Sequence, residues 1–200
     1  MADSNITKRA LARALKDLMR EQPFEKISVG EICEACEMNR KSFYYHFKDK
    51  YDLVEWIFNT EFIDFVKRTN VDDQWEFLGA LCRYFYEERA FYVKVLAFRG
   101  QNSFRQYFRE FILTAIEPIL LPRAAAAIQL TGCEDFTAEE MASFYAAILT
   151  DTLLLAIFRW LEGGAKMPPD RFVALLRSAA DYVRLCAGNA AGGGGGAAQE

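Results

Sequence analysis

The sequence predicts an all-α chain of about nine helices: a three-helix head at the N-terminus and a larger helical body. Apolar residues recur at intervals of three and four rather than alternating, which is the helical period. Two capping boxes, Ser28–Glu31 and Thr137–Glu140, mark helix starts. Helix breakers are few, because the 200 residues include 5 Pro and 12 Gly, and five of the glycines form the run 192–196.

The first fifty residues predict three helices joined by tight turns. Their expected spans are 5–21, 28–36 and 40–45. Gln22-Pro23 ends the first helix and Asn39 can cap the third. Two short helices joined by about three residues, the second basic and polar outside, are typical of a helix-turn-helix, in which the first helix braces the second.

The body continues as helices without strand alternation. A long helix is expected over 49–70, and aromatic stripes then mark helices around 77–85, 91–98 and 104–111. Pro118 and Pro122 are expected to end the last of these, and 124–130 to form a separate short helix. The final helices are expected over 137–161 and 169–186. The sequence thus divides into a helix-turn-helix domain (1–48), a ligand-binding and dimerisation domain (49–187) and a disordered Ala/Gly tail (188–200).

Composition and charge exclude several classes of protein. The net charge of −4 excludes a polycation that coats nucleic acid, although residues 1–50 hold 10 Lys and Arg against 8 acids. The 17 Phe, 9 Tyr and 3 Trp need a core or a cavity. Five widely spaced Cys and the lack of an apolar leader in 1–20 predict a cytoplasmic protein with free thiols. The apolar run 145–158 is short for a membrane span and predicts a buried helix.

Candidate catalytic and metal-binding groups are sparse. His46 is the single histidine, which argues against a His-based metal site or a Ser–His pair. Cys33 and Cys36 have no second pair, so packing is the favoured interpretation and thiol sensing the alternative. The acidic pairs Glu87-Glu88 and Glu139-Glu140 look like solvated helix faces. We therefore expect no enzyme activity, no cofactor and no metal.

The first sixty residues resemble the TetR-type (tetracycline-repressor-like) family of bacterial transcription regulators. The resemblance is carried by Phe24-x-x-Ile27-Ser28-Val29-x-Glu31-Ile32, by the segment from Met38 to Phe47, and by Lys50-x-x-Leu53. The DNA-contacting positions that it implies are Ser28, Asn39, Arg40, Lys41, Ser42, Tyr44, Tyr45, His46 and Lys50. Ser28 would also cap its helix, Arg40 could read guanine, and His46 and Lys50 would meet phosphates.

The resemblance has two departures. Glu37 stands where the family usually has glycine in the turn, so a left-handed backbone there would cost more. Lys41 stands where a small residue is common, which indicates a different base preference.

The aromatic stripes of the body predict a ligand pocket as well as a core. Tyrosine hydroxyls in an apolar interior need partners, and a cavity with few polar groups is typical of a small-molecule site. The expected pocket residues are Tyr84, Phe85, Tyr92, Tyr107, Phe108, Phe111 and Tyr145.

These expectations combine into a homodimeric repressor that binds a near-palindromic DNA operator and is switched by a small molecule. The dimer is expected through helices 137–161 and 169–186. The candidate contacts, some of which must instead face the core, are Leu153, Leu154, Ala156, Ile157, Phe172, Leu175, Leu176 and Ala179. The helix over 49–70 would carry the switch from body to head. The alternative is a DNA-binding regulator controlled by a protein partner, or constitutive, without a small-molecule effector.

Overall fold

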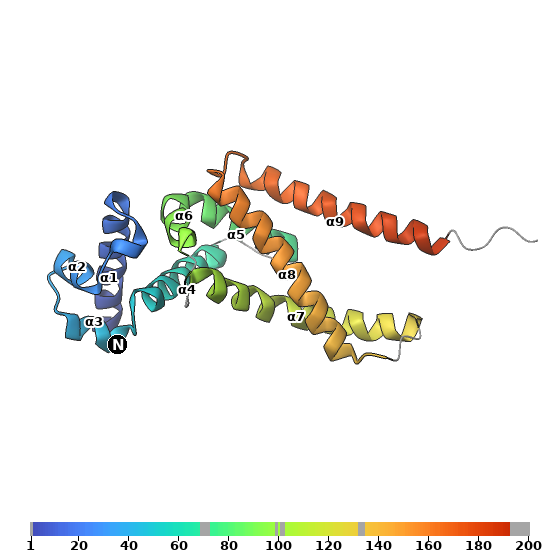
Figure 1. Cartoon of the computed structure of the whole chain (residues 1–200), viewed down its shortest axis with the longest axis horizontal. Coiled ribbons are helices and arrows are strands. Elements are labelled where there is room, and N and C mark those ends of the chain that lie inside the picture. Colours follow the sequence, from blue (N-terminus) through green and yellow to red (C-terminus); the bar gives the residue numbers. More distant parts are fainter. Residues whose placement is uncertain (1, 69–72, 99, 101–102, 132–134, 193–200) are drawn as a thin grey trace, which may run out of the picture.

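Helices make up almost all of the chain, with the small head at one end of an elongated body (Figure 1). The computed structural model describes residues 2–68, 73–98, 100, 103–131 and 135–192, and this part contains nine α-helices, one 3-10 turn and no strand. The predicted all-α class is confirmed.

The head is held together by apolar side chains from its three helices. These are α1 (Ala2–Glu21), α2 (Val29–Ala35) and α3 (Arg40–His46), and a 3-10 turn, η1 (Phe24–Lys26), joins α1 to α2. Leu11 and Leu15 of α1, Ile32 of α2 and Phe43 of α3 are all completely buried. Because each helix contributes to one small core, packing sets the angle between α2 and α3.

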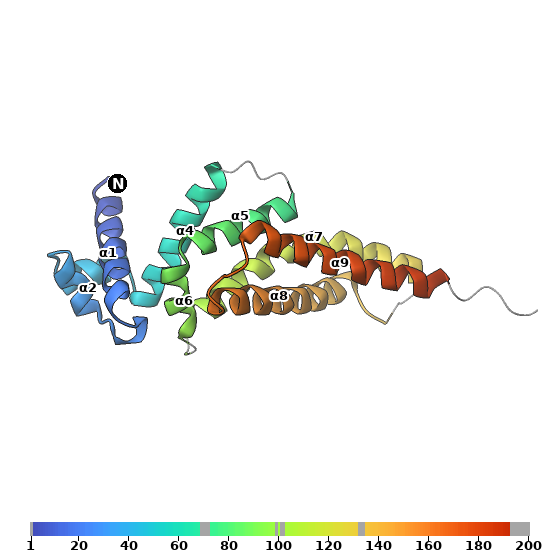
Figure 2. The same cartoon turned by 90° about the horizontal axis from the view of Figure 1, so that it is seen from above.

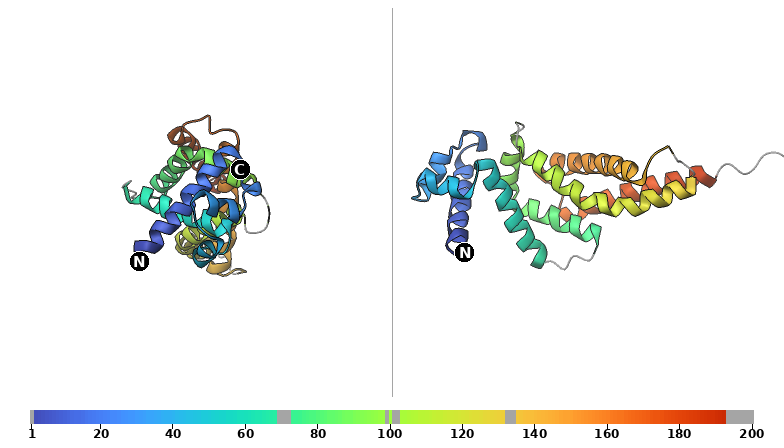
Figure 3. Two further views of the ribbon diagram at one scale, coloured as in Figure 1. Left: turned by 90° about the vertical axis from the view of Figure 1, so that its left-hand side faces the viewer. Right: turned by 90° about the horizontal axis from the view of Figure 1, so that it is seen from below.

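The body consists of six helices. They are α4 (Lys50–Arg68), α5 (Gln74–Glu87), α6 (Arg89–Ala97), α7 (Phe104–Thr131), α8 (Ala138–Glu162) and α9 (Pro169–Gly192). The helix α4 connects the head to the body (Figure 2). α7 and α8 form a long antiparallel pair with the most extensive contact between helices, and α9 packs mainly on α5 (Figures 1 and 3).

The expectation that Pro118 and Pro122 end their helix is wrong. The helix α7 runs through both prolines to Thr131, so 124–130 is its last part and not a separate helix. The two prolines are four residues apart and both are exposed, which places them on the solvent side of α7. Water can solvate the carbonyls that lose their amide partners there, while packing on α8 holds the other side in helical form.

The last two helices begin as predicted, but the final one is longer. Thr137 caps α8 in a full capping box, with its hydroxyl accepting from the Glu140 amide at 3.2 Å. At the other end, Trp160 Nε1 donates to the Met167 carbonyl at 2.9 Å and fixes the turn into α9. The helix α9 continues to Gly192, so residues 188–192 are helical and not part of a disordered tail. Residues 193–200 lie outside the described part of the chain.

Among the residues that the structure describes, two body helices are long and apolar enough, by length and composition, to cross a membrane. They are Phe104–Gln129, with mean hydropathy 1.6, and Ala138–Glu162, with mean hydropathy 1.8. Mostly buried core helices of soluble proteins pass the same test, but only 11% of the first window and 33% of the second are buried here, although the two helices pack along each other. The expectation that the apolar run 145–158 is a buried helix is wrong for one side of α8, where Tyr145, Ile148, Leu149 and Leu155 are exposed.

Phe58 of α4 is the centre of an aromatic core that joins four body helices. Its ring lies 5.1 Å from Phe62 and 5.4 Å from Phe108, measured between centroids. The other rings within 6.4 Å of it are Tyr84, Phe85, Tyr92, Phe104, Tyr107 and Phe111. Movement of α4 must therefore be accommodated by rings from α5, α6 and α7.

Candidate nucleic-acid interface

The first helix of the helix-turn-helix begins at a complete capping box. The Ser28 hydroxyl accepts from the Glu31 amide at 3.2 Å, and the Ser28 amide donates to Glu31 Oε2 at 2.7 Å. These bonds from Ser28 are the main reason that the pKa of the Glu31 carboxyl is lowered. The predicted capping role of Ser28 is confirmed.

The turn between α2 and α3 requires a left-handed residue, which is Glu37 at φ 55°. Around it the Glu37 amide donates to the Glu34 carbonyl at 3.1 Å and the Met38 amide to the Cys33 carbonyl at 2.8 Å. This pair of bonds is a Schellman motif, which normally places glycine at the left-handed position. The predicted strain at Glu37 is therefore present in the fold.

The second helix presents a polar and aromatic face on a buried support. Asn39 accepts from the Ser42 amide at 2.8 Å, which caps α3. Phe43 and Phe47 are buried with ring centroids 5.8 Å apart. The opposite side exposes Tyr44 by 58% and Tyr45 by 83%, together with Arg40 and Lys41. Apolar rings are thus anchored inside while long polar side chains face outward, as a groove-reading helix requires.

The remaining side chains of this face take up distinct positions. Ser42 Oγ donates to Asn39 Oδ1 at 3.1 Å, so these two polar groups are partly engaged with each other. The His46 ring is half-buried and packs edge-on against Tyr45, with centroids 4.9 Å apart.

Lys50 differs from the other expected DNA contacts because its ammonium group is used inside the head. Nζ donates to the carbonyls of Phe24 at 2.8 Å, Glu25 at 3.0 Å and Ile27 at 2.8 Å. It also lies 4.7 Å from the centroid of the Phe24 ring. Burial is the main cause that lowers the pKa of this amine. All three ammonium protons are engaged, so in this conformation Lys50 ties α4 to the turn before α2.

The Cys33–Cys36 pair lies within the head rather than at its surface. Cys33 is buried and Cys36 Sγ donates to the Ile32 carbonyl at 3.2 Å. Burial raises the pKa of both thiols, which lowers their thiolate fraction at neutral pH. Across the described residues no group of three His, Cys, Asp or Glu side chains could hold a metal ion.

Comparison with known families decides the identity of this fold. Residues 8–57 match the family described as bacterial regulatory proteins, tetR family, and residues 73–182 match the family described as transcriptional regulator C-terminal region (TetR_C_8). The second match alone spans more than half of the chain. The chain belongs to the TetR family. It is therefore a DNA-binding transcriptional regulator.

Individual TetR-family relatives agree with this assignment. The HTH-type dhaKLM operon transcriptional activator DhaS of Lactococcus lactis subsp. lactis (strain IL1403) is 31% identical over 109 residues, which are 54% of this chain and 57% of that protein. The match thus spans a little over half the length of this curated relative.

Solved structures show the same fold. The structure of a dihydroxyacetone kinase operon activator DhaS has a TM-score of 0.52 at 23% identity, covering 86% of this chain and 95% of that one. The fatty acid degradation regulator FadR from Bacillus halodurans has a TM-score of 0.59 at 13% identity, covering 86% and 93%.

Two lysines tie the head of this TetR-family chain to its body. Lys16 Nζ on α1 donates to Glu61 of α4 at 2.6 and 2.7 Å and to Glu88 at 3.0 Å. In the opposite direction, Lys94 of α6 donates to the Met19 carbonyl at the end of α1. We call these contacts the lysine latch. Sequence reasoning missed it, because Lys16 is 45 and 72 residues away from its partners.

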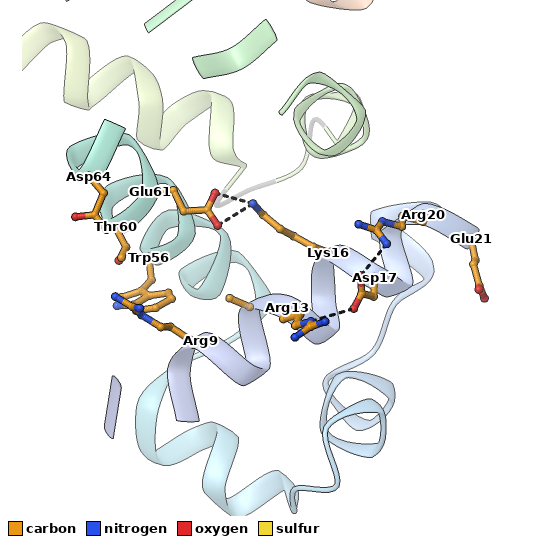
Figure 4. A pocket seen from close by; sticks show the side chains of 11 residues that line it. Arg9, Arg13, Lys16, Asp17, Arg20, Glu21, Trp56, Thr60, Glu61 and Asp64 are labelled. Atoms are coloured by element: carbon orange, nitrogen blue, oxygen red, sulfur yellow. Dashed lines mark hydrogen bonds and ion pairs between the residues drawn. The ribbon is translucent and has the colours of Figure 1, made fainter. Parts of the chain in front are cut away.

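The lysine latch lies beside a polar groove of about 650 Å³ between α1 and α4 (Figure 4). The groove is lined by Arg9, Ala12, Arg13, Lys16, Asp17, Arg20 and Glu21 of α1 and by Trp56, Thr60, Glu61 and Asp64 of α4. Charges of both signs face one another across it, so it offers no uniform field for a cation or an anion.

The expected pocket residues divide into three groups. Tyr84, Phe85, Tyr92 and Phe108 are buried in the aromatic core. The Tyr84 and Tyr92 hydroxyls lie 2.7 Å apart, and Tyr84 also donates to Glu61 Oε2 at 3.2 Å. Burial is the main cause that raises the pKa of both phenols far above the usual range. These hydroxyls are thus satisfied by the protein itself.

Of the other three residues, Tyr107 and Phe111 are half-buried at the edge of the aromatic core and Tyr145 is exposed. Tyr107 and Phe111 line a shallow depression of about 390 Å³ on α7, together with Glu110, Thr114 and Ala115. Tyr107 donates to Asn59 Oδ1 at 2.6 Å. Tyr145 is 43% exposed on α8, where it neighbours Phe144, and does not join the core rings.

The last two helices expose an apolar face. Of the expected dimer contacts, Leu154 and Ile157 are buried in the monomer core, whereas Leu175 is 54% exposed. The exposed apolar residues of α8 are Phe144, Tyr145, Ile148, Leu149 and Leu155, with exposures between 43% and 63%. The first four recur at three- and four-residue intervals and Leu155 follows Ile148 by seven residues, so they form one stripe along the helix, which we call the α8 stripe.

Proposed function

We propose that this TetR-family regulator acts as a homodimer on a near-palindromic operator and that a small molecule switches its affinity. The observation that carries the proposal is the combination of an outward polar face on α3 with the exposed α8 stripe. A single helix-turn-helix contacts few base pairs, so selectivity requires two heads about 34–36 Å apart on successive major-groove faces.

Base-edge contacts are assigned to side chains that project freely from α3. Lys41, Tyr44 and Tyr45 are exposed, and a tyrosine ring can contact a thymine methyl while its hydroxyl bonds a phosphate. Ser28, Asn39, Ser42 and His46 are assigned to the DNA backbone. Lys50 is assigned to the inner support of the head, because its donors are already satisfied.

The dimer is proposed to form through α8 and α9. A row of large, half-exposed apolar side chains is unfavourable in water. Burying these side chains against a second copy would stabilise the dimer by about 25 cal/mol for each Å² of apolar surface removed from water. In this proposal residues 1–48 form the domain that binds DNA, and residues 49–187 form the domain that provides the effector and dimer contacts.

The proposed effector site is the depression on α7. Tyr107 and Phe111 offer aromatic faces, while Glu110 and Thr114 offer polar groups that would orient a ligand. Both rings touch Phe58 of α4, with centroid distances of 6.3 and 5.3 Å. A ligand that shifts these rings would move α4 and, through Glu61 and the lysine latch, the head. Coupling of about 1–3 kcal/mol suffices for a 5- to 150-fold change in operator affinity.

A second candidate is control by a protein partner, or constitutive DNA binding. It is favoured by one observation: four of the expected pocket rings are packed in a core whose hydroxyls are already paired. The relative from Lactococcus lactis is described as an activator, so the expectation of a repressor has no support from it. The cytoplasmic location of this chain remains part of the proposal.

Selection of duplexes from a random-sequence DNA pool tests the proposal directly. We expect a site with two inverted half-sites whose centres are 10–10.5 base pairs apart, or a multiple of this. Recovery of an asymmetric single site would contradict the dimer.

Thermal-shift screening against metabolite pools then separates the two modes of control. A compound that shifts the melting temperature of the wild type but not that of Phe111→Ala supports the depression on α7 as the effector site. A co-purifying protein in the absence of any such compound supports the second candidate.

A further inference from the structure

Arg40, the first residue of α3, folds back onto the first helix of the motif. A side-chain carbon built at Gly30 of α2 would overlap Arg40 Nη2 and lie 3.1 Å from both Cζ and Nε. The guanidinium group therefore covers the backbone of Gly30, in space that any other residue type would fill. Arg40 is exposed, and no ion pair engages it within the described residues.

The position of the guanidinium group decides which part of DNA it can meet. In a helix-turn-helix the second helix enters the major groove, whereas the first helix crosses the sugar-phosphate backbone. A guanidinium group that lies on α2 is thus placed for a phosphate rather than for a base edge, and its fork of donors fits phosphate oxygens well. Lys41 and Tyr44, which remain on the outer face of α3, keep access to the bases.

We propose that Arg40 is a phosphate clamp and that Gly30 is the residue that positions it. This rests on the proposed function, because it assumes that α3 enters the groove of an operator. It differs from the expectation that Arg40 reads guanine. Gly30 lies within α2, where alanine would be the better helix former, so the glycine is explained by the space that it leaves for Arg40.

The test uses the full-length protein and four variants: Arg40→Ala, Gly30→Ala, the double variant, and Gly79→Ala as a matched control. Gly79 is also helical and also lies against an arginine, Arg83, but it is in α5 of the body. Affinity is measured for the duplex selected by the wild type and for a scrambled duplex, over a range of salt concentrations. Each variant also passes through the random-pool selection.

Arg40→Ala is expected to weaken binding to both duplexes by a similar factor, about tenfold, and to leave the selected sequence unchanged. The slope of log affinity against log salt should decrease by about 0.9 for each lost phosphate contact, hence by about 1.8 for two heads. Gly30→Ala should reproduce most of this loss when Arg40 is present and have no effect in the Arg40→Ala background. Gly79→Ala should bind like the wild type.

Other outcomes overturn the inference. If Arg40→Ala relaxes the selected sequence at one base pair of each half-site with an unchanged salt slope, Arg40 reads a base. If the effects of Gly30→Ala and Arg40→Ala add independently, or if Gly30→Ala binds like the wild type, Gly30 does not position the clamp. The proposed function fails separately, namely if the wild type selects no duplex from the pool.

Discussion

Glu37 concentrates backbone strain at the turn that joins α2 and α3. A non-glycine residue in the left-handed region lowers the stability of the folded state by about 1–2 kcal/mol. Glycine removes this strain, but it also makes the unfolded chain more flexible, which offsets part of the stabilisation. We therefore expect Glu37→Gly to raise the free energy of unfolding by about 0.5–1 kcal/mol. Denaturant titration measures it, with Glu34→Gly in the α2 helix as the control that should lower stability by about 1 kcal/mol.

Lys50 shows how a charged residue near a DNA-binding surface can serve the fold instead. Lys50→Met keeps the length of the side chain but removes donors from three carbonyls, so we expect a loss of about 2–4 kcal/mol in the free energy of unfolding. The salt dependence of DNA binding should remain that of the wild type. A salt slope reduced in the folded variant would show that Lys50 contacts a phosphate after all.

Several site residues could be predicted from sequence because their roles depend on local spacing. The capping box at Ser28, the cap at Asn39, and the alternation of buried Phe43 and Phe47 with exposed Arg40, Lys41 and Tyr44 all follow from intervals of three and four. The paths of the long side chains could not be predicted. Arg40 turns back to Gly30 and Lys50 reaches the Phe24 carbonyl, and both are set by tertiary contacts.

At the scale of elements, Glu55 of α4 lies near other carboxylates, one of which is Glu110 of α7. Burial is the main cause that raises the pKa of the Glu55 carboxyl, and Asp52, Asp49 and Glu110 raise it further. The folded protein then binds a proton more readily than the unfolded chain, so Glu55 lowers stability as pH rises from the ordinary glutamate pKa through the raised value.

Glu55→Gln should accordingly stabilise the protein at pH 7 and lose this advantage once the pH falls below the ordinary glutamate pKa. Melting temperatures recorded between pH 4 and pH 8 provide the measurement. Glu87→Gln, at the exposed end of α5, is the control. An advantage of Glu55→Gln that stays constant over this range would rule out titration as its cause.

Within the lysine latch, the ammonium group of Lys16 joins α1 to Glu61 of α4 and to Glu88 between α5 and α6. Lys16→Met leaves Glu61 and Glu88 near each other without the cation between them, and because both are only about one-third exposed, we expect a loss of about 1–2 kcal/mol. Adding Glu61→Gln to Lys16→Met should restore most of the lost stability, because it removes one of the two facing negative charges. Chemical denaturation of the single and double variants measures the coupling, and additive losses would show that the latch is not a coupled unit.

The elements themselves were largely predictable, and the two exceptions have different causes. Capping signals gave the starts of α2, α3 and α8, and the period gave the apolar sides of α1 and α4. The rule that proline ends a helix failed at Pro118 and Pro122, because packing along α8 outweighs local preference. Six of the seven expected pocket residues surround Phe58, but four of them fill the core instead of lining a pocket. Periodicity identifies the inward side of a helix but not whether the interior is filled.

At the scale of the whole molecule, the α8 stripe is expected to hold the dimer. Ile148→Glu introduces a charge at the middle of the stripe, where the side chain is 48% exposed in the monomer, so folding should persist while the dimer dissociates. Sedimentation velocity should show a monomer, and operator affinity should fall at least tenfold. Gln74→Glu, at the exposed first residue of α5, should remain dimeric. A dimeric Ile148→Glu would place the interface elsewhere.

The position of Trp56 gives the molecule an optical reporter of its own. Its indole lines the groove where α1 meets α4 and packs against Phe47, with ring centroids 5.8 Å apart, while Trp75 and Trp160 lie in α5 and α8. If both of these are replaced by phenylalanine and the light used for excitation is absorbed by tryptophan and not by the nine tyrosines, the emission comes from the junction alone. Tilting of the DNA-binding helices could then be followed in real time as a change in fluorescence, without an attached dye.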